Sequence, residues 1–379
     1  MNIAVIIQDL RMRGGAERRT SQLIRELIAA GHEVHLYANR CDPQAAEGVV
    51  FHHVPMLNVP RPLKPLSFAW FCSQVIPRGK HDLVHTQARI FRYDTVTLGV
   101  GCHRAFLEAI GVAPLRSRDK WFHRAVMHIE RKMLAPGSYR RIITNSRKVR
   151  DEIGRYYAVP ESDVTVIHNG VDHDAFSPGV RDRLRPGARA ELGLRRDEVA
   201  VVLVGTGFEH KGVRDLIRAI GIFAKGKRPL TMRAFIVGAG KTEPYERIMA
   251  DLGVSDLIVW AGKSSDVRTY YAAADIYVLP TLYDAFSNST MEALACGLPV
   301  ITTRTNGVSE ILTEGESAFI VEPRDPESLA DRLGLLIEAP ALRERMGSAA
   351  QKAAEPYTWQ RTAEETIRVY EEILGIGGI

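Results

Sequence analysis

Two acidic residues, Asp284 and Glu292, lie eight positions apart on either side of a run of small and polar residues. That run, S-N-S-T from 287 to 290, contains residue types that begin α-helices, so exposed helix N–H groups are expected between the two acids. Such N–H groups attract anions, whereas carboxylates accept hydrogen bonds from hydroxyl groups. The arrangement therefore suits a ligand that carries both a phosphate and hydroxyl-bearing rings.

The spacing of Ser289 and Glu292 also has a purely structural interpretation. S-x-x-E is the pattern of a capping box, in which the glutamate bonds back to the start of its own helix. This interpretation accounts for Glu292 but leaves Asp284 and the lack of bulk at 287–290 unexplained. A nucleoside diphosphate–sugar would use all these features, with acids on its ribose and hexose hydroxyls and helix amides on its diphosphate.

A second stretch, VGTGFEHKGV from 204 to 213, could supply the cation that a diphosphate requires. Gly205 and Gly207 allow the backbone to turn tightly after a strand, and Lys211 follows at the expected start of the next helix. A lysine at this place could join the helix N–H groups in holding a diphosphate. The alternative is an ordinary surface lysine.

The elements that must position these residues follow from the alternation of apolar runs and helical patterns. The runs IAVII (3–7) and EVHLYA (33–38) flank a helical pattern over 16–30, and this order is typical of a parallel α/β sheet. A second alternation begins at AVVLVG (200–205), after a polar segment at 177–189 that we interpret as a linker and helix start. The 379 residues are also enough for two domains.

Further strands are expected in both halves of the chain, and a last helix at its end. The strands are predicted at 82–86, 141–145, 164–170, 232–238, 257–262, 275–280 and 298–303, and the helix at 358–375. Loops that follow parallel strands gather at one edge of a sheet, where ligands bind. We therefore expect the loops 205–212, 262–264 and 281–289 to meet at one edge of the second sheet.

The sequence argues against several other classes of protein. The segments at 235–242 and 221–228 each fail the phosphate-loop pattern of NTPases at one position, and the turn with Gly14 and Gly15 lacks the dinucleotide pattern G-x-G-x-x-G. Four scattered cysteines without a C-x-x-C pair argue against a zinc site or a disulfide framework and favour a reducing cytosol. We find no signal-peptide pattern and no apolar run approaching the ~18 residues of a membrane span.

The charge is unevenly distributed along the chain. Residues 61–160 contain 19 Lys and Arg against 7 Asp and Glu, although the formal net charge of the whole chain is only +5. Within this part, 115–134 mixes basic residues with Trp121, Phe122 and other apolar residues. This pattern is typical of peripheral association with an anionic membrane, and the alternative is a helix that packs its apolar face on its own domain. We find no motif that supports nucleic-acid binding.

Taken together, these stretches resemble the retaining glycosyltransferases of GT-B fold, in particular glycosyltransferase family 4. The acid-x7-acid stretch resembles the donor-sugar loop of the family, and 204–220 resembles its diphosphate loop. The segment RMRGGAERRTSQLIRELIAAGHEV resembles its N-terminal Gly-Gly loop and helix, and NGVSEIL and the last helix also fit. The resemblance covers nearly the whole chain. It implies two doubly wound Rossmann-like domains facing across a cleft: an acceptor-binding domain at 1–172, a nucleotide-sugar-binding domain at 173–357, and a helix at 358–379 that packs back on the first domain.

The resemblance also implies roles for individual residues. Glu292 would bind the ribose hydroxyls, while Asp284, Lys211 and His103 would be catalytic, contacting the donor hexose, the diphosphate and the acceptor side of the reacting carbon, respectively. Gly15 would let the N-terminal loop approach the phosphates. The amides of Phe286, Ser287 and Asn288, with the adjoining Ala285, would hold the sugar and the distal phosphate. The backbone at Lys263 and Ser264 would read the base, and Thr206 and His210 would bind the donor beside Lys211.

Two departures from the family pattern concern this site. The first acid is usually Glu, so the shorter Asp284 leaves the donor hexose open. An arginine that often precedes the lysine is absent, and Thr206 and His210 occupy those places, where a protonated His210 could support the phosphate clamp. For His103 the alternative is a histidine that is satisfied at a helix start.

The resemblance implies an enzyme that moves a hexose, expected to be glucose from a UDP-linked donor, with retention and without a metal or other cofactor. The expected acceptor is lipid-linked or a saccharide such as the lipopolysaccharide core, at the inner face of the cytoplasmic membrane. A nucleotide-sugar 2-epimerase of the same fold and a non-catalytic sugar-nucleotide-binding protein are the alternatives. The oligomeric state is left open.

Overall fold

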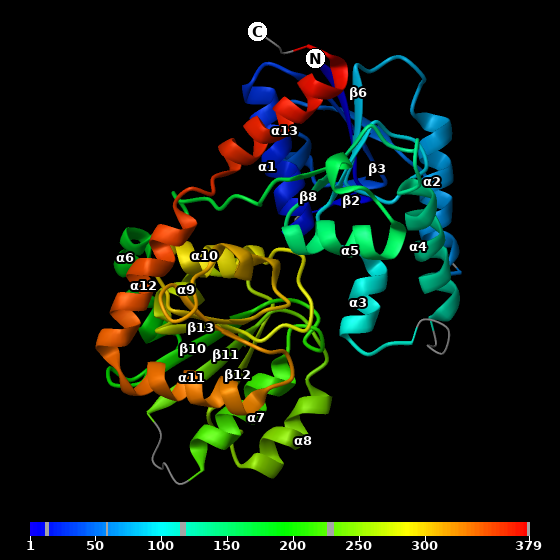
Figure 1. Cartoon of the computed structure of the whole chain (residues 1–379). Helices are drawn as coiled ribbons and strands as arrows, with labels where there is room; N and C mark the ends of the chain where they lie inside the picture. Colours follow the sequence, from blue (N-terminus) through cyan, green and yellow to red (C-terminus); the bar gives the residue numbers. More distant parts are fainter. Residues whose placement is uncertain (12–14, 58–59, 114–118, 226–230, 377–379) are drawn as a thin grey trace. The chain divides into compact units, whose positions relative to one another are not determined.

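The computed structural model describes residues 1–379 except 12–14, 58–59, 114–118, 226–230 and 377–379 (Figure 1). The chain divides into two compact units: unit 1 is Met1–Gly170 with Trp359–Ile379, and unit 2 is Val171–Thr358. The expected boundaries, after 172 and after 357, lie within two residues of these divisions. Each unit contains a parallel sheet flanked by helices, which confirms the predicted α/β class with two Rossmann-like domains.

The sheet of unit 1 has seven parallel strands. Their order across the sheet is β5 (Val50–His53), β3 (Glu33–Ala38), β1 (Asn2–Ile6), β6 (Leu83–Thr86), β7 (Thr95–Leu98), β8 (Arg141–Thr144) and β9 (Val164–Val166). The chain runs outward from β1 to β5 and then returns to β6, so the direction of winding reverses between β1 and β6. A separate short pair is formed by β2 (Asp9–Leu10) and β4 (Arg40–Cys41).

The helices of unit 1 include the last helix of the chain. They are α1 (Gly15–Ala29), α2 (Leu63–Val75), α3 (His103–Ala109), α4 (Lys120–Met133), α5 (Arg147–Tyr157) and α13 (Trp359–Leu374), with 3-10 turns at Pro43–Ala46 and Glu161–Asp163. Figure 1 shows α13, in red, beside α1, in blue. Ala363 and Tyr370 of α13 lie in one apolar core with Leu23 and Leu27 of α1 and Val5 of β1. The C-terminal helix therefore packs on the first domain, as predicted.

The sheet of unit 2 has six parallel strands. Their order is β12 (Ile258–Gly262), β11 (Met232–Val237), β10 (Val199–Val204), β13 (Ile276–Leu279), β14 (Val300–Thr303) and β15 (Ala318–Val321). Every residue of β10 is buried and apolar, which is typical of a parallel strand covered on both faces. The winding reverses between β10 and β13, and such reversal points are where open α/β sheets bind ligands.

Helices cover both faces of this sheet. They are α6 (Pro178–Glu191), α7 (Val213–Ala224), α8 (Glu243–Leu252), α9 (Arg268–Ala273), α10 (Asn288–Ala295), α11 (Pro326–Glu338) and α12 (Pro340–Ala354), with a 3-10 turn at Gly307–Ile311. Figure 1 shows α7, α8 and α11 on one face and α6, α9, α10 and α12 on the other. Within these groups α7 packs on α8 and α11, α6 on α9, and α10 on α12.

The segment at 177–189 is helical rather than a linker. Most of it lies in α6, which contains Pro186 in its interior. Arg185 and Arg189 lie one turn apart and both donate to Asp275, at 2.5 Å and 3.2 Å, as well as to nearby backbone carbonyls. These tertiary bonds hold a helix that its Pro-, Gly- and Arg-rich composition disfavours.

Candidate active site

Two loops meet at the carboxyl edge of the unit 2 sheet, where the winding reverses. One follows β10 and the other follows β13, which are neighbours in the sheet. The carbonyl of His210 in the first loop accepts hydrogen bonds from Thr281 Oγ1 at 2.8 Å and from the backbone N–H of Leu282 at 2.7 Å. The predicted meeting of the loops 205–212 and 281–289 is therefore observed.

Two glycines allow the backbone to approach so closely. Gly212 has a φ of +73°, and a Cβ on it would lie 1.8 Å from the carbonyl oxygen of Pro280. Gly238 has a φ of +138°, and a Cβ on it would lie 1.9 Å from the carbonyl oxygen of Gly205. The N–H of Gly238 also donates to the carbonyl of Gly262 at 2.7 Å, which connects the loop after β12 to the same edge. Other residues at these two positions would displace the loops.

Lys211 and Asp284 form an ion pair at this edge. Their Nζ and Oδ2 atoms are 2.5 Å apart, and both side chains are largely buried. The aliphatic part of Lys211 lies across Gly205, where an added Cβ would be 3.0 Å from Cε. The cation and the first acid of the sequence pattern are thus in contact, and each neutralises the other in this structure.

Helix α10 begins one position after Ser287. Ser287 is its N-cap, and its side chain accepts a hydrogen bond from the N–H of Thr290 at 3.3 Å. The predicted capping box of Ser289 and Glu292 is therefore wrong. Ser289 lies inside the helix, and its hydroxyl instead donates to the carbonyl of Val204 at 2.9 Å, which ties the helix start to the end of β10.

Glu292 is buried and bonds to a tyrosine of another helix. Its Oε2 accepts a hydrogen bond from the hydroxyl of Tyr271 at 2.8 Å. Burial and the neighbouring carboxylate raise the pKa of Tyr271 well above its usual value, so its hydroxyl keeps its proton and remains a donor. No sequence signal pointed to Tyr271 as the residue that orients Glu292.

A buried asparagine, Asn306, organises the loop between Asp284 and α10. Its Oδ1 accepts from the N–H groups of Ser287 at 3.3 Å and Val308 at 3.2 Å, and its Nδ2 donates to the hydroxyls of Thr290 at 3.1 Å and Thr302 at 3.0 Å. The Ser287 amide, one of the three expected to hold the donor phosphate, thus already donates within the chain. The Asn-Gly dipeptide at 306–307 marks a turn and was the available signal for this residue.

The other predicted donor-binding residues are arranged around this cluster with different degrees of exposure. Thr206 and Lys263 are exposed in the loops after β10 and β12. Ser264 is half-buried, and its hydroxyl accepts from the N–H of Asp266 at 3.1 Å. Ala285 and Phe286 are buried, and Phe286 belongs to the core of unit 2. Asn288 is the first residue of α10.

His210 does not carry a positive charge at neutral pH. Burial, followed by the nearby Lys211, lowers its pKa to about 4, although Asp284 acts in the opposite direction. Its ring packs on Gly207, where an added Cβ would lie 2.4 Å from Cε1. Without a bound diphosphate the ring is therefore neutral at pH 7, and a protonated His210 in the phosphate clamp stays a prediction.

His103 lies in unit 1, at the first position of α3. Its backbone N–H donates to Oε1 of the buried Glu130 at 3.1 Å, and Glu130 also pairs with Arg89 at 2.7 Å. Its ring Nε2 lies 3.1 Å from Nδ1 of His123. Burial, followed by Arg89, lowers the pKa of His103 to about 4, so the ring is neutral at pH 7. His103 is thus satisfied at a helix start, as the alternative interpretation proposed.

Gly15 also lies in unit 1, as the first residue of α1, whereas Gly14 lies outside the described residues. Unit 2 therefore brings together Lys211, His210, Asp284 and the start of α10. Gly15 and His103 belong to the other unit.

The basic stretch at 115–134 is described from Asp119 onward and contains the whole of α4. Val126 and Ile129 are buried, so the apolar face of α4 packs within its own unit. Trp121 is the exception, because 59% of it is exposed. Lys120 and Arg124 lie over its ring at 5.7 Å and 5.0 Å from the centroid. What α4 presents to solvent is thus a tryptophan among basic residues.

Two general features of the described part of the chain bear on the site. None of its groups of His, Cys, Asp and Glu residues is arranged as a set of three or more that could hold a metal ion. Likewise, none of its helices has the length and apolar character needed to cross a membrane.

The chain is similar to known glycosyltransferase families and proteins. Residues 13–175 match the family described as Glycosyltransferase Family 4, and residues 185–353 match Glycosyl transferases group 1. The D-inositol 3-phosphate glycosyltransferase of Streptomyces griseus is 31% identical over 254 residues, which cover 62% of this chain and 54% of that protein.

Two solved structures share the fold over almost the whole chain. WaaG, a glycosyltransferase involved in lipopolysaccharide biosynthesis, has a TM-score of 0.85 at 20% identity, covering 98% of this chain and 100% of its own. Anabaena HepE in complex with UDP-glucose has a TM-score of 0.74 at 17% identity, covering 98% of this chain and 99% of its own.

Proposed function

Because this chain belongs to the GT-B glycosyltransferases of family 4, we propose that it transfers a hexose from a nucleoside diphosphate sugar to a hydroxyl of a saccharide or glycolipid, with retention of configuration. The observation that carries this proposal is the cluster at the carboxyl edge of the unit 2 sheet. There Lys211 and Asp284, which lie 73 residues apart in the sequence, form an ion pair. The N-cap of α10, Ser287, follows Asp284 in the same loop.

The donor is proposed to be UDP-glucose. Its binding would replace the ion pair between Lys211 and Asp284 with contacts from each residue to the donor. The diphosphate of the donor would draw Lys211 toward itself, and a hexose hydroxyl would take over Asp284. Glu292, oriented by Tyr271, would receive the ribose hydroxyls. The GT-B fold shared with HepE, which has been solved with UDP-glucose, supports this choice of donor.

The chemistry is proposed to rest on electrostatic stabilisation of the leaving nucleoside diphosphate. Its negative charge grows as the glycosidic bond breaks, and the ammonium that donor binding has drawn to the diphosphate stabilises that charge together with helix N–H groups. Lys211 is suited to this because its stem is held across Gly205. We propose that the acceptor hydroxyl attacks the anomeric carbon from the same face from which the leaving group departs. We also propose that no metal ion takes part. His103, neutral at pH 7, would contact the reacting groups by hydrogen bonding and not by charge.

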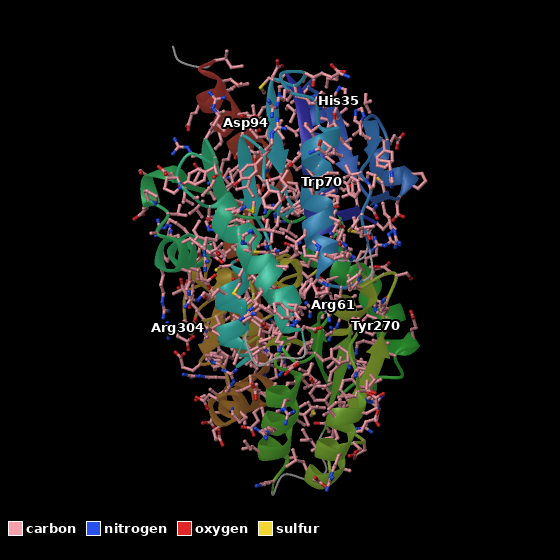
Figure 2. All side chains as sticks on the ribbon, turned by 90° about the vertical axis from the view of Figure 1, so that its right-hand side faces the viewer. His35, Arg61, Trp70, Asp94, Tyr270 and Arg304 are labelled. Carbon is pink, nitrogen blue, oxygen red and sulfur yellow. The ribbon has the colours of Figure 1, made fainter. Side chains whose placement is uncertain are left out.

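The acceptor is proposed to be anionic and lipid-linked, such as the lipopolysaccharide core, reached at the inner face of the cytoplasmic membrane. Two exposed tryptophans support peripheral binding: Trp70 on α2 is 55% exposed and Trp121 on α4 is 59% exposed, and these two helices pack together. Figure 2 shows Trp70 on α2 and Arg61 near the start of that helix, on the same side. Exposed tryptophans on a basic part of the chain suit the interface of an anionic bilayer.

The proposed function is tested first by binding and then by turnover. Thermal unfolding with UDP-glucose, UDP-galactose, UDP-GlcNAc and GDP-mannose should show stabilisation by UDP-glucose above the others, in proportion to RT ln(1 + [L]/Kd). UDP-glucose incubated alone should give slow hydrolysis and no epimer, and adding an acceptor saccharide should give an α-linked product. An epimer without acceptor identifies a 2-epimerase, and binding without any hydrolysis or transfer identifies a sensor.

Membrane association is tested by flotation with vesicles. We expect binding to vesicles containing anionic lipid at low salt, with loss in the double variant Trp70→Ala/Trp121→Ala. The matched control is Trp260→Phe in unit 2, which should bind like the wild type. Absence of flotation at low salt removes the membrane proposal and leaves the transfer reaction untouched.

A further inference from the structure

A buried arginine of unit 1, Arg19, has no anionic partner among the residues that the structure describes. Arg19 lies in α1 and is only 3% exposed. Within the described residues, neither its Nε nor its Nη1 has a hydrogen-bond partner, and no carboxylate forms an ion pair with it. Burial lowers its pKa to about 10, so it is still a cation at neutral pH. A buried charge of this kind is normally paired with an anion.

Two buried groups that interact electrostatically with Arg19, His85 and Tyr370, do not offer that anion. His85 is fully buried, and its two ring nitrogens contact the hydroxyls of Tyr370 at 2.5 Å and Thr97 at 2.8 Å. Burial, followed by Arg19, lowers the pKa of His85 to about 3, so this ring is neutral. Burial also raises the pKa of Tyr370, so its hydroxyl is neutral as well. The guanidinium therefore lies among neutral groups whose hydrogen bonds are already made.

A second buried side chain, Asn145, also has an unmatched polar atom. Both Asn145 and Arg19 contact Gly99. Asn145 is 0% exposed, and its Nδ2 donates to the carbonyl of Gly99 at 3.0 Å. That bond fixes the orientation of the amide, and Oδ1 has no partner in the part of the chain that the structure describes. Arg19 approaches Gly99 from its Cα side, because a Cβ there would lie 2.7 Å from Nη1. The two side chains that carry the unmatched donors and the unmatched acceptor thus both contact Gly99.

This corner of unit 1 lies where a parallel sheet binds ligands. Gly99 directly follows β7 and Asn145 directly follows β8, so both lie at the carboxyl edge of the sheet. Gly99 is partly exposed and the next residue, Val100, is 53% exposed, so solvent reaches the residue that the guanidinium contacts. The surrounding segment at 61–160 has the 19-to-7 surplus of basic over acidic residues, which favours an anionic ligand.

We propose that Arg19 and Asn145 form a subsite in unit 1 for an anionic group, a phosphate or a carboxylate, that lies next to a hydroxyl. Arg19 supplies N–H donors and positive charge to the anionic oxygens, and Asn145 Oδ1 accepts from the neighbouring hydroxyl. Because Gly99 has no side chain, the guanidinium can occupy the space beside it. The identification of this ligand as the acidic sugar of the acceptor rests on the proposed function, whereas the anion site rests on the contacts of Arg19 alone.

The test is thermal unfolding with inorganic phosphate and, separately, acetate, at constant ionic strength set with sodium chloride. UDP is present at saturating concentration so that it occupies the proposed donor site of unit 2. We expect saturable stabilisation of the wild type by the preferred anion, and the comparison of phosphate with acetate identifies which group is bound. The variant Arg19→Met should weaken the apparent affinity for that anion at least tenfold. Arg25→Met, an exposed position on the same helix, is the matched control and should respond like the wild type.

The outcomes separate this inference from the proposed function. Equal anion responses in Arg19→Met and the wild type, or no response of the wild type to either anion, overturn the subsite. If Arg19→Met does not unfold cooperatively, Asn145→Asp decides, because its new carboxylate competes with the ligand and should abolish the anion response; an unchanged response overturns the subsite. Failure of UDP to stabilise any variant contradicts the proposed function and leaves the anion comparison readable.

Discussion

At the scale of single residues, the contact between Lys211 and Asp284 joins the two charges that the sequence pattern singled out. Lys211→Ala removes the ammonium that would balance the leaving diphosphate. We expect kcat/KM to fall at least tenfold, and each decade corresponds to about 1.4 kcal/mol of lost transition-state stabilisation. Steady-state transfer from UDP-glucose measures this, with Lys352→Ala on the exposed surface of α12 as the control. Near-wild-type turnover by a correctly folded Lys211→Ala enzyme contradicts the proposed phosphate clamp.

A second residue-scale prediction concerns the buried His85 and acid stability. Its pKa is lowered from 6.5 to about 3 in the folded chain, so between these values the unfolded chain binds a proton that the folded chain does not. Stability that is present above pH 6.5 is therefore lost as the pH falls toward 3. The loss from His85 alone at pH 5 is about 2 kcal/mol.

Urea unfolding at pH 7.5 and pH 5 measures this loss. His85→Gln cannot titrate, so its free energy of unfolding should fall by about 2 kcal/mol less than that of the wild type over this range. His103 and His210 act in the same direction in both proteins, so they cancel in the comparison. An equal fall in the two proteins would mean that His85 is not held neutral by the fold.

At the scale of elements, the loop that carries Lys211 depends on one glycine at the start of α7. Gly212 has a φ of +73° and faces the carbonyl of Pro280, whereas Gly253 has a φ of +65° with nothing within 4 Å of an added Cβ. Gly253→Ala should therefore cost only the strain of its left-handed backbone, about 1 kcal/mol. Gly212→Ala adds a backbone clash and should cost about 3 kcal/mol or more. Chemical unfolding of both variants checks the difference, and equal costs contradict the tight contact between these loops.

The sequence predicted elements well wherever apolar runs were long and buried. The runs at 33–38 and 200–205 correspond closely to β3 and β10, and the last helix was placed within one residue at each end. β5 was missed because VFHH is a short edge strand with exposed side chains, so it has no apolar run to detect.

The charged residues of the candidate site were predicted, but the residues that orient them were not. Lys211 and Asp284 were found because Gly-rich and acid-flanked loops have a spacing that can be read along the chain. Tyr271 and Asn306 orient this site from other elements, and only the fold brings them there. The capping box failed because Ser289, the serine of this run that fits S-x-x-E, donates its hydroxyl to the end of β10, and Ser287 caps the helix instead.

At the scale of the whole molecule, the chain forms its first unit from both of its ends. Residues from Trp359 onward belong to unit 1 although unit 2 lies between them and the rest of that unit in the sequence. Tyr370 of α13 is fully buried against α1 and bonds to His85 of β6. A substitution in the last turns of the chain should therefore destabilise the N-terminal domain.

This gives a prediction for calorimetric unfolding, in which the two units contribute separate transitions. Tyr370→Ala leaves a large cavity in unit 1 and should lower the stability of that transition by about 3–5 kcal/mol. UDP should raise only the transition of unit 2, because the proposed donor residues lie there. Arg368→Ala, exposed on the same helix, is the control and should leave both transitions unchanged. If Tyr370→Ala lowers the transition that UDP raises, then α13 stabilises the donor-binding unit, and the division of the chain at Trp359 is wrong.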